Sequence, residues 1–392
     1  MANKKFPFLL IADAFLCTVF TCIVSGLLYF FILNLSILDP FEKAFEDFEF
    51  TDIYYAEGFY KKEAAADIIV INVEQADRYM LAQALQKISA YQPKAVGLDL
   101  LFKERKTAFE DEALQAALQQ VPNLVKAVYF DQDTLITSAP YFQTPTEQQG
   151  FINFNLDGSS SVVRDFNGVL EYQEREIPSL AGALAVAAGY ISTATLKTNY
   201  TTPVPIRYTG GSEAFLTLSV DELLSRERLD VLTDAVVLLG YAGTPTGNPF
   251  DIEDKHFTPL NAAFTGRATP DTFGVFIHAT ILQNLKSGKT FTALPKMFTL
   301  TLAFLIAFGS ILLGMYIHKK SNFIFDISVK VLQLLVPIVL LYLVLHLLSW
   351  QIYLNVLPVI LLVILGLECI DFYIYLQEFI RKKYPWKSYL LD

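Results

Sequence analysis

Cysteine is scarce in this chain of 392 residues: it contains three. Cys17, Cys22 and Cys369 all lie in long apolar runs, so the segment 39–290 has none. That segment must therefore fold without disulfide bonds. A domain of this kind is compatible with the bacterial periplasm, although cysteine content alone does not assign a compartment.

Positive charge is scarce in the same segment. Residues 39–290 contain 34 Asp and Glu against 20 Lys and Arg, and 20 − 34 gives a net charge of −14 in a chain whose total is −10. Phosphate groups are repelled by such a surface. The composition therefore argues against binding of nucleic acid or of anionic lipid by charge.

Motifs of covalent catalysis are also missing from the sequence. There is no G-x-S-x-G, no H-E-x-x-H and no Walker loop. The glycine-rich stretch 240–248, GYAGTPTGN, lacks the Lys-Ser/Thr pair that a phosphate-binding loop needs. We therefore predict a protein that is not an enzyme and has no cofactor and no metal site.

Apolar residues are abundant: 53% of the chain is hydrophobic and the mean hydropathy is +0.39. The first of four long apolar runs follows Lys4 and Lys5 and no small-residue cleavage site follows it, so we predict an uncleaved anchor. Each run is near the ~20 residues that a membrane-spanning helix needs. The four runs are 6–35, 294–317, 329–348 and 352–375.

The basic residues around these runs predict one topology. Clusters at 4–5, 318–320 and 381–383 fall on the same side if four helices alternate across a bilayer. By the positive-inside rule that side is the cytoplasm, so both termini are predicted to be cytoplasmic, in the bacterial inner membrane. The predicted domains are an anchor (1–38), a periplasmic domain (39–290), three transmembrane helices (291–380) and a short cytoplasmic tail (381–392).

The periplasmic segment has the pattern of an α/β domain. Strand 67–73, helix 76–91 and strand 94–102 form a βαβ unit, whose two strands are expected to be parallel. The alternation continues, which predicts a mostly parallel sheet covered by helices on both faces. Before it, Phe41, Phe45 and Phe48 have helical spacing. The further predicted elements are helices 109–120, 179–189, 219–226 and 275–285 and strands 124–130 and 235–243.

Acids stand where the strands of this sheet end. Ligand crevices of open parallel sheets lie at the carboxyl ends of the strands, and Glu74 and Asp99 fall there. Asp99 either lines such a crevice or binds neighbouring backbone N–H groups in a turn. We predict that Arg164 neutralises Asp99 or Asp251. The candidate ligand-binding set, for which a structural ion-pair network is the alternative, is Glu74, Asp99, Arg164, Asp251 and His278.

Three acids lie inside the apolar runs: Asp13, Glu368 and Asp371. Ionisable groups in a bilayer must find partners. Glu368 and Asp371 are three residues apart and share a helix face. Either these acids reach the inner interface, or they contact a basic residue of a second membrane protein.

The order of several segments resembles the CHASE2 family, extracytoplasmic sensory domains of bacterial signalling receptors. The similar segments are FTD at 50–52, DIIVINVE at 67–74, QPKAVGLDLLF at 92–102, GFINFNLDGSSSVVRDF at 150–166, VVLLGYAG at 236–243 and GVFIHATILQNLKSG at 274–288. An N-terminal anchor and three later membrane helices are typical of the family.

The resemblance implies a receptor-like sensor. Family members usually carry a cytoplasmic output domain after the last helix, and the tail 381–392 leaves no room for one. We therefore predict that the stimulus is relayed to a separate protein. A structural or docking subunit of an envelope complex is the alternative. Expected partners are other membrane or periplasmic proteins, membrane lipid and further copies of this chain in a homo-oligomer.

Overall fold

The computed structural model describes residues 6–34, 50–144, 148–156, 161–261 and 269–391. The chain divides into two compact units, one of Thr51–Phe291 and one of Met1–Phe50 with Thr292–Asp392. The helix predicted from Phe41, Phe45 and Phe48 lies outside the described residues. A short helix, α3 (Phe50–Ala56), comes directly after them.

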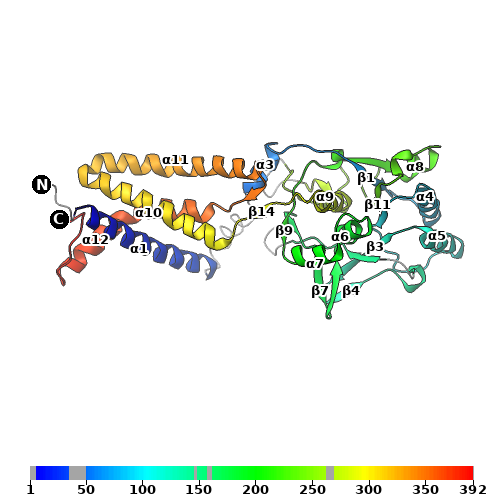
Figure 1. The fold of residues 1–392 in the computed structure, drawn as a ribbon, viewed down its shortest axis with the longest axis horizontal. Helices are drawn as coiled ribbons and strands as arrows, with labels where there is room; N and C mark the ends of the chain where they lie inside the picture. Colours follow the sequence, from blue (N-terminus) through cyan, green and yellow to red (C-terminus); the bar gives the residue numbers. More distant parts are fainter. Residues whose placement is uncertain (1–5, 35–49, 145–147, 157–160, 262–268, 392) are drawn as a thin grey trace. The chain divides into compact units, whose positions relative to one another are not determined.

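The first unit is built on a seven-stranded sheet in the order β10-β1-β11-β2-β3-β4, with β5 also paired to β3 (Figure 1). All pairings are parallel except that of β4 with β3. The prediction of a mostly parallel sheet is confirmed. The strands are β1 (Ala65–Asn72), β2 (Ala95–Leu98), β3 (Leu124–Asp131), β4 (Thr134–Ile136), β5 (Gln148–Phe151), β10 (Phe215–Ser219) and β11 (Val236–Gly240).

Helices cover both faces of this sheet. On one face α4 (Arg78–Ala90), α5 (Ala108–Gln120) and α8 (Val220–Ser225) share a hydrophobic core with the strands. On the other face α6 (Leu180–Ala187) packs over β2 and β3, and α9 (Gly274–Ser287) packs over β1 and β11. Both faces of each central strand are buried, which is why their sequences are continuous apolar runs.

A further strand lies between the two strands of the predicted βαβ unit, and the sequence pattern did not predict this position. β1 and β2 are parallel, as predicted, but β11 lies between them, with Val70 opposite Leu238 and Leu238 opposite Gly97. The carboxyl ends of three strands therefore adjoin. β2 ends at Leu98, four residues earlier than predicted, so Asp99 lies just beyond its end.

Small elements complete this unit beside the sheet. They are two antiparallel pairs, β6 (Asp165–Phe166) with β9 (Val204–Pro205) and β7 (Val169–Tyr172) with β8 (Arg175–Pro178), the helix α7 (Thr193–Asn199), and β12 (Lys255–His256) paired with β13 (Thr272–Phe273). β13 runs directly into α9, which brings the loop before β12 to the start of that helix.

The second unit contains four helices that are long and apolar enough to cross a membrane: α1 (Phe6–Asn34), α10 (Lys296–Lys320), α11 (Asn322–Ser349) and α12 (Leu357–Arg381). α12 packs closely on α10. A Cβ at Gly366 would lie 2.9 Å from Ile311 Cδ1, and one at Gly314 would lie 2.8 Å from Ile370 Cδ1. Glycines thus let these two helices approach each other. After the end of α11, β15 (Ile352–Tyr353) pairs with β14 (Thr292–Ala293).

Candidate functional site

The end of β1 holds the loop that follows β11. Asn72 Nδ2 donates to Gly243 O at 2.7 Å, and Asn72 Oδ1 accepts from Ala242 N at 2.8 Å. Glu74 Oε1 accepts from Thr246 N at 2.8 Å. The predicted site residue Glu74 therefore has a structural task in this loop, and its role in ligand binding stays a prediction.

Asp251 organises the same loop from within. Its carboxylate accepts hydrogen bonds from the Tyr241 hydroxyl, from Thr244 N at 3.0 Å and from Glu253 N at 3.1 Å. The hydrogen bond from Tyr241, followed by that from the Thr244 backbone, holds the pKa of Asp251 below its usual range. Asp251 therefore acts as the acceptor that shapes this turn.

Arg164, another residue of the predicted site, pairs with a residue of α3 and not with the loop after β11. Its Nε and Nη2 donate to the two carboxylate oxygens of Asp52 in α3, at 3.0 and 2.7 Å. The two side chains are 11% and 3% exposed. The expectation that Arg164 neutralises Asp99 or Asp251 is wrong, because among the described residues its ion pair is with Asp52 and no hydrogen bond or ion pair joins it to either of those two acids. Its partner precedes it by 112 positions, a distance at which local sequence patterns carry no information.

Asp99 lies beside Gly240 and the first turn of α9, and His278 is a residue of that helix. We define the Asp99 cluster as Asp99, Phe154, Asp254, His256 and His278. The Phe154 ring lies 4.7 Å from the ring centre of each histidine, and His256 Nε2 lies 4.0 Å from Asp254 Oδ1. The pattern of apolar runs pointed to Asp99 and His278 but not to the other three.

Two glycines show how closely the acids of this cluster approach α9. A Cβ at Gly240 would lie 3.2 Å from Asp99 Cβ and 2.9 Å from Val275 Cγ2, in the first turn of α9. A Cβ at Gly274 would lie 3.3 Å from Asp254 Oδ2. Because neither glycine carries a Cβ, the side chains of Asp99 and Asp254 fit beside α9.

The protonation equilibria in the cluster are shifted by burial. Burial, followed by repulsion from Asp254, raises the pKa of Asp99 to about 7. Burial and then Glu253 raise the pKa of Asp254, although its side chain is 45% exposed and water reduces the effect. The start of α9 favours the charged form of a nearby carboxylate by only about 0.3–1 kcal/mol, less than the opposing effect of burial.

The two imidazoles of the cluster carry no charge that could offset these acids at neutral pH. Burial, followed by the neighbouring His256, lowers the pKa of His278 to about 3, and burial lowers that of His256. His278 is 3% exposed, and among the described residues its Nδ1 has no hydrogen-bond partner. Among the described residues no group of three or more His, Cys, Asp and Glu is arranged to hold a metal ion.

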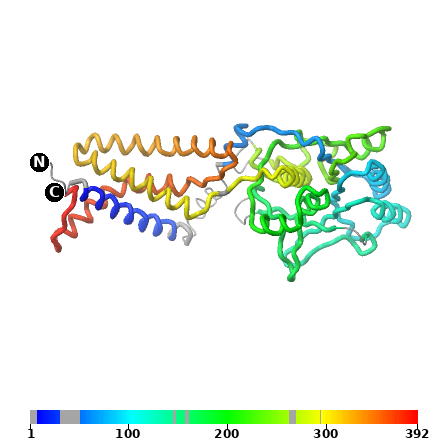
Figure 2. The backbone as a smooth tube through the Cα atoms, viewed as in Figure 1, coloured from blue at the N-terminus to red at the C-terminus, as the bar shows by residue number. Residues whose placement is uncertain are grey.

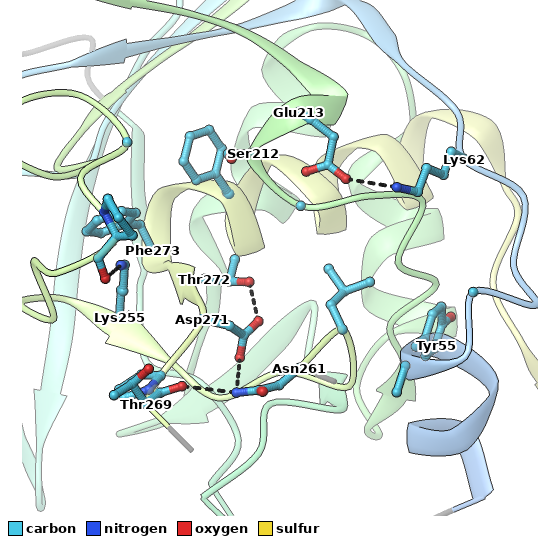
Figure 3. Close-up of a pocket in the computed structure, with 18 of the residues that line it drawn as sticks. Tyr55, Lys62, Ser212, Glu213, Lys255, Asn261, Thr269, Asp271, Thr272 and Phe273 are labelled. Atoms are coloured by element: carbon cyan, nitrogen blue, oxygen red, sulfur yellow. Dashed lines mark hydrogen bonds and ion pairs between the residues drawn. The ribbon is translucent and has the colours of Figure 1, made fainter. Parts of the chain in front are cut away.

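A separate cavity of about 620 Å³ opens beside α3 and the start of α9 (Figure 3). Its charged residues interact with one another or with the surrounding chain. Lys62 lies 3.7 Å from Glu213, and Asp271 accepts from Asn261 Nδ2 at 3.3 Å and from Thr272 Oγ1 at 2.7 Å. Because these groups are already paired, the lining does not specify a ligand of either net charge.

In the helical unit Asp13 is the centre of a buried network. Its carboxylate is 2% exposed and accepts from Gln377 Nε2 at 2.9 Å, Ser388 Oγ at 2.8 Å and Tyr389 N at 2.7 Å. It thereby joins α1 to α12 and to the segment after α12, which runs back beside the start of α1 (Figure 2). Asp13 has its partners within the chain.

Glu368 and Asp371 are used differently. Glu368 Oε1 accepts from Lys330 Nζ and Gln333 Nε2, both at 2.7 Å, and so joins α12 to α11. Asp371 is exposed, and within the described residues no hydrogen bond or ion pair engages it. It lies more than two turns from either end of α12. The two acids do not act as a pair.

Replacing Asp13 with Leu should release the segment after α12, because Gln377, Ser388 and the Tyr389 amide would lose their common acceptor in a buried place. We expect trypsin to cleave after Lys387 about tenfold faster in the variant than in the parent. The control is Thr18→Val, since the buried Thr18 hydroxyl bonds only within its own helix, to Ala14 O. Equal cleavage of the Asp13 variant and the control would contradict this role.

A parallel α/β domain joined to four helices of membrane-spanning length fits a multi-pass membrane protein with a large domain outside the bilayer. The chain belongs to the CHASE2 family: the family's CHASE2 domain model matches residues 25–316. CHASE2 domains are extracytoplasmic sensory domains. No curated protein and no solved structure matches the chain.

Proposed function

We propose that this protein is a receptor-like sensor subunit of the bacterial inner membrane. A stimulus in the periplasm acts on the CHASE2 domain, and the four helices relay it to a separate partner protein. Membership of a sensory domain family supports the first part. The domain lies between α1 and α10 in the chain, which supports the second, since a change in it acts on helices at both of its ends.

The main support for the proposed relay is that the three acids in the membrane helices differ in their hydrogen bonding. Asp13 and Glu368 accept hydrogen bonds inside the chain, whereas Asp371 accepts none from the residues that the structure describes. A carboxylate within a membrane helix costs about 2.5–3.5 kcal/mol unless it is paired or reaches water. His318 and Lys330 act on Asp371 by charge, but neither lies within ion-pair distance of it among the described residues. A basic or hydrogen-bonding side chain from a partner helix would offset this cost.

The exposed face of α12 around Asp371 supports such a contact. Phe372, Tyr375 and Phe379 are 65%, 68% and 59% exposed on it. Large aromatic side chains beside one polar group are typical of the centre of a protein contact. The partner we propose is therefore a membrane protein that places a basic side chain opposite Asp371.

A photo-reactive residue at Tyr375, one turn after Asp371, tests this proposal in intact membranes. We expect a protein adduct at this position and only lipid adducts at Leu334, which is 64% exposed on α11. Asp371→Leu should reduce the protein adduct about tenfold, while Glu368→Gln keeps it, because Glu368 serves the α11 contact.

The identity and ratio of the adduct decide between the two functions. A signalling protein whose adduct changes with the stimulus supports the relay. A constant, stoichiometric envelope protein would favour the structural subunit. A protein adduct that is as strong in Asp371→Leu as in the parent would contradict the role of Asp371.

A further inference from the structure

The charged residues that line the cavity of about 620 Å³ fall into two groups. Lys255 donates hydrogen bonds to two backbone carbonyl groups of the loop after β11, and Asp271 accepts several from its neighbours. Lys62 and Glu213 take part in no hydrogen bond with the residues that the structure describes. Lys62 and Glu213 therefore keep their hydrogen-bonding capacity for a molecule that enters the cavity.

These two side chains lie side by side in the lining (Figure 3). Lys62 Nζ is 3.7 Å from Glu213 Oε1, which is longer than a hydrogen bond, and the side chains are 71% and 58% exposed. An exposed ion pair of this kind adds little stability, because water screens it and two long side chains lose freedom in forming it. A ligand can therefore replace this contact at little cost.

Two opposite charges this close together select the charge pattern of a ligand. An anion that binds Lys62 is repelled by Glu213, and a cation that binds Glu213 is repelled by Lys62. A neutral molecule would displace water from both charges and supply no charge in return. A zwitterion with neighbouring ammonium and carboxylate groups can pair with both side chains at once, through charge-assisted hydrogen bonds.

The rest of the lining leaves room for the other groups of such a ligand. The volume of the cavity is within the range of about 300–1,000 Å³ that is typical of ligand sites. Tyr60, Leu260, Phe273 and Phe276 also line the cavity and supply apolar groups. The charged pair and this apolar surface together match a molecule that carries a zwitterionic head and a side chain.

We infer that this cavity binds a free α-amino acid, whose carboxylate pairs with Lys62 and whose ammonium group pairs with Glu213. The inference deepens the proposed function by naming the chemical class of the stimulus, and it rests on that function only for the onward relay. The cavity is lined by the segment after α3 and by the start of α9. Since α3 follows α1 in the chain and α9 precedes α10, the ligand contacts the segments that lead to both helices.

Isothermal titration calorimetry of the full chain in detergent, with each of the common L-amino acids as the probe, tests the inference. We expect at least one of them to bind. Its amide lacks the carboxylate and its N-acetyl derivative lacks the ammonium group, so each should bind more weakly by on the order of tenfold. If no amino acid binds, or if either derivative binds as tightly as the amino acid, the inference is overturned.

Two variants and a matched control test the two residues. Lys62→Met and Glu213→Gln should each weaken binding on the order of tenfold and should keep the fold, because both side chains are exposed. Lys197→Met, which breaks the surface pair with Glu176, should bind the amino acid as the parent does. Binding that survives undiminished in both cavity variants would overturn the inference. A failed relay alters none of these results, because binding is measured on the chain itself.

Discussion

Replacing Arg78 with Met should lower the free energy of unfolding of the α/β domain by about 3–5 kcal/mol. Arg78 Nη1 binds Asp111, and the two side chains are 9% and 1% exposed. The guanidinium also donates to Glu104 O at 2.8 Å and lies over the rings of Phe102 and Phe142. Without it, the Asp111 charge remains buried with too few partners.

Denaturant unfolding of the full chain, monitored by a signal of the α/β domain, measures this loss. Arg78→Met with Asp111→Leu should recover most of it, since an apolar pair of similar volume replaces a buried ion pair at little cost. The matched control is Arg228→Met, whose exposed pair with Asp230 lies at the surface, and its stability should barely change. A double variant no more stable than Arg78→Met would refute the explanation.

This buried pair also makes the stability of the domain depend on pH in the acid range. Burial alone would raise the pKa of Asp111, but the hydrogen bonds from Arg78 and from Lys106 N outweigh it and lower that pKa. The stabilisation is therefore present above the unfolded pKa of about 3.9 and is lost as the pH falls through the folded value. Denaturant unfolding of the full chain at several acid pH values measures this loss, which should be absent in Arg78→Met with Asp111→Leu.

Replacing Arg164 with Met should lower the free energy of unfolding by about 3 kcal/mol, and Arg164→Lys should lower it by roughly half as much. The bidentate contact with Asp52 joins α3 to the segment before β6. Lysine keeps the charge but cannot donate two parallel hydrogen bonds to one carboxylate. The measurement is again denaturant unfolding of the full chain.

A double-mutant cycle with Asp52→Leu separates the Arg164 pair from general packing. We expect a coupling free energy of about 2 kcal/mol between positions 52 and 164. Lys197→Met, which breaks the surface pair with Glu176, serves as the control for loss of a basic residue. Additive effects at positions 52 and 164 would show that the two side chains do not stabilise each other.

The structure also refines what was predicted of the acids in the helices. One of the two interpretations of the sequence was that Glu368 and Asp371 contact a basic residue of a second membrane protein. The two residues share a helix face, as their spacing predicted, but Lys330 and Gln333 engage Glu368 within the chain. Spacing along one helix places side chains on a face, whereas the neighbouring helix decides which of them is used.

The sequence by itself determined the elements and their class. Apolar runs bounded by turn residues predicted β1, β3 and β11, and the helical pattern predicted α4, α5 and α9, because both signals depend on local periodicity. The long apolar runs likewise predicted the four helices of the second unit. The position of Asp99 at a strand end followed from the same reasoning.

Only the tertiary structure decided which distant residues meet. The insertion of β11 between β1 and β2 places Gly240, at the end of β11, beside Asp99, although the two residues are far apart in the sequence. The ion pair of Arg164 with Asp52 and the hydrogen bond from Ser388 to Asp13 likewise join residues that are far apart in the sequence. Local periodicity reports which face of an element is buried, but partners far apart in sequence are selected by packing of the whole chain, where burial makes each unpaired charge costly.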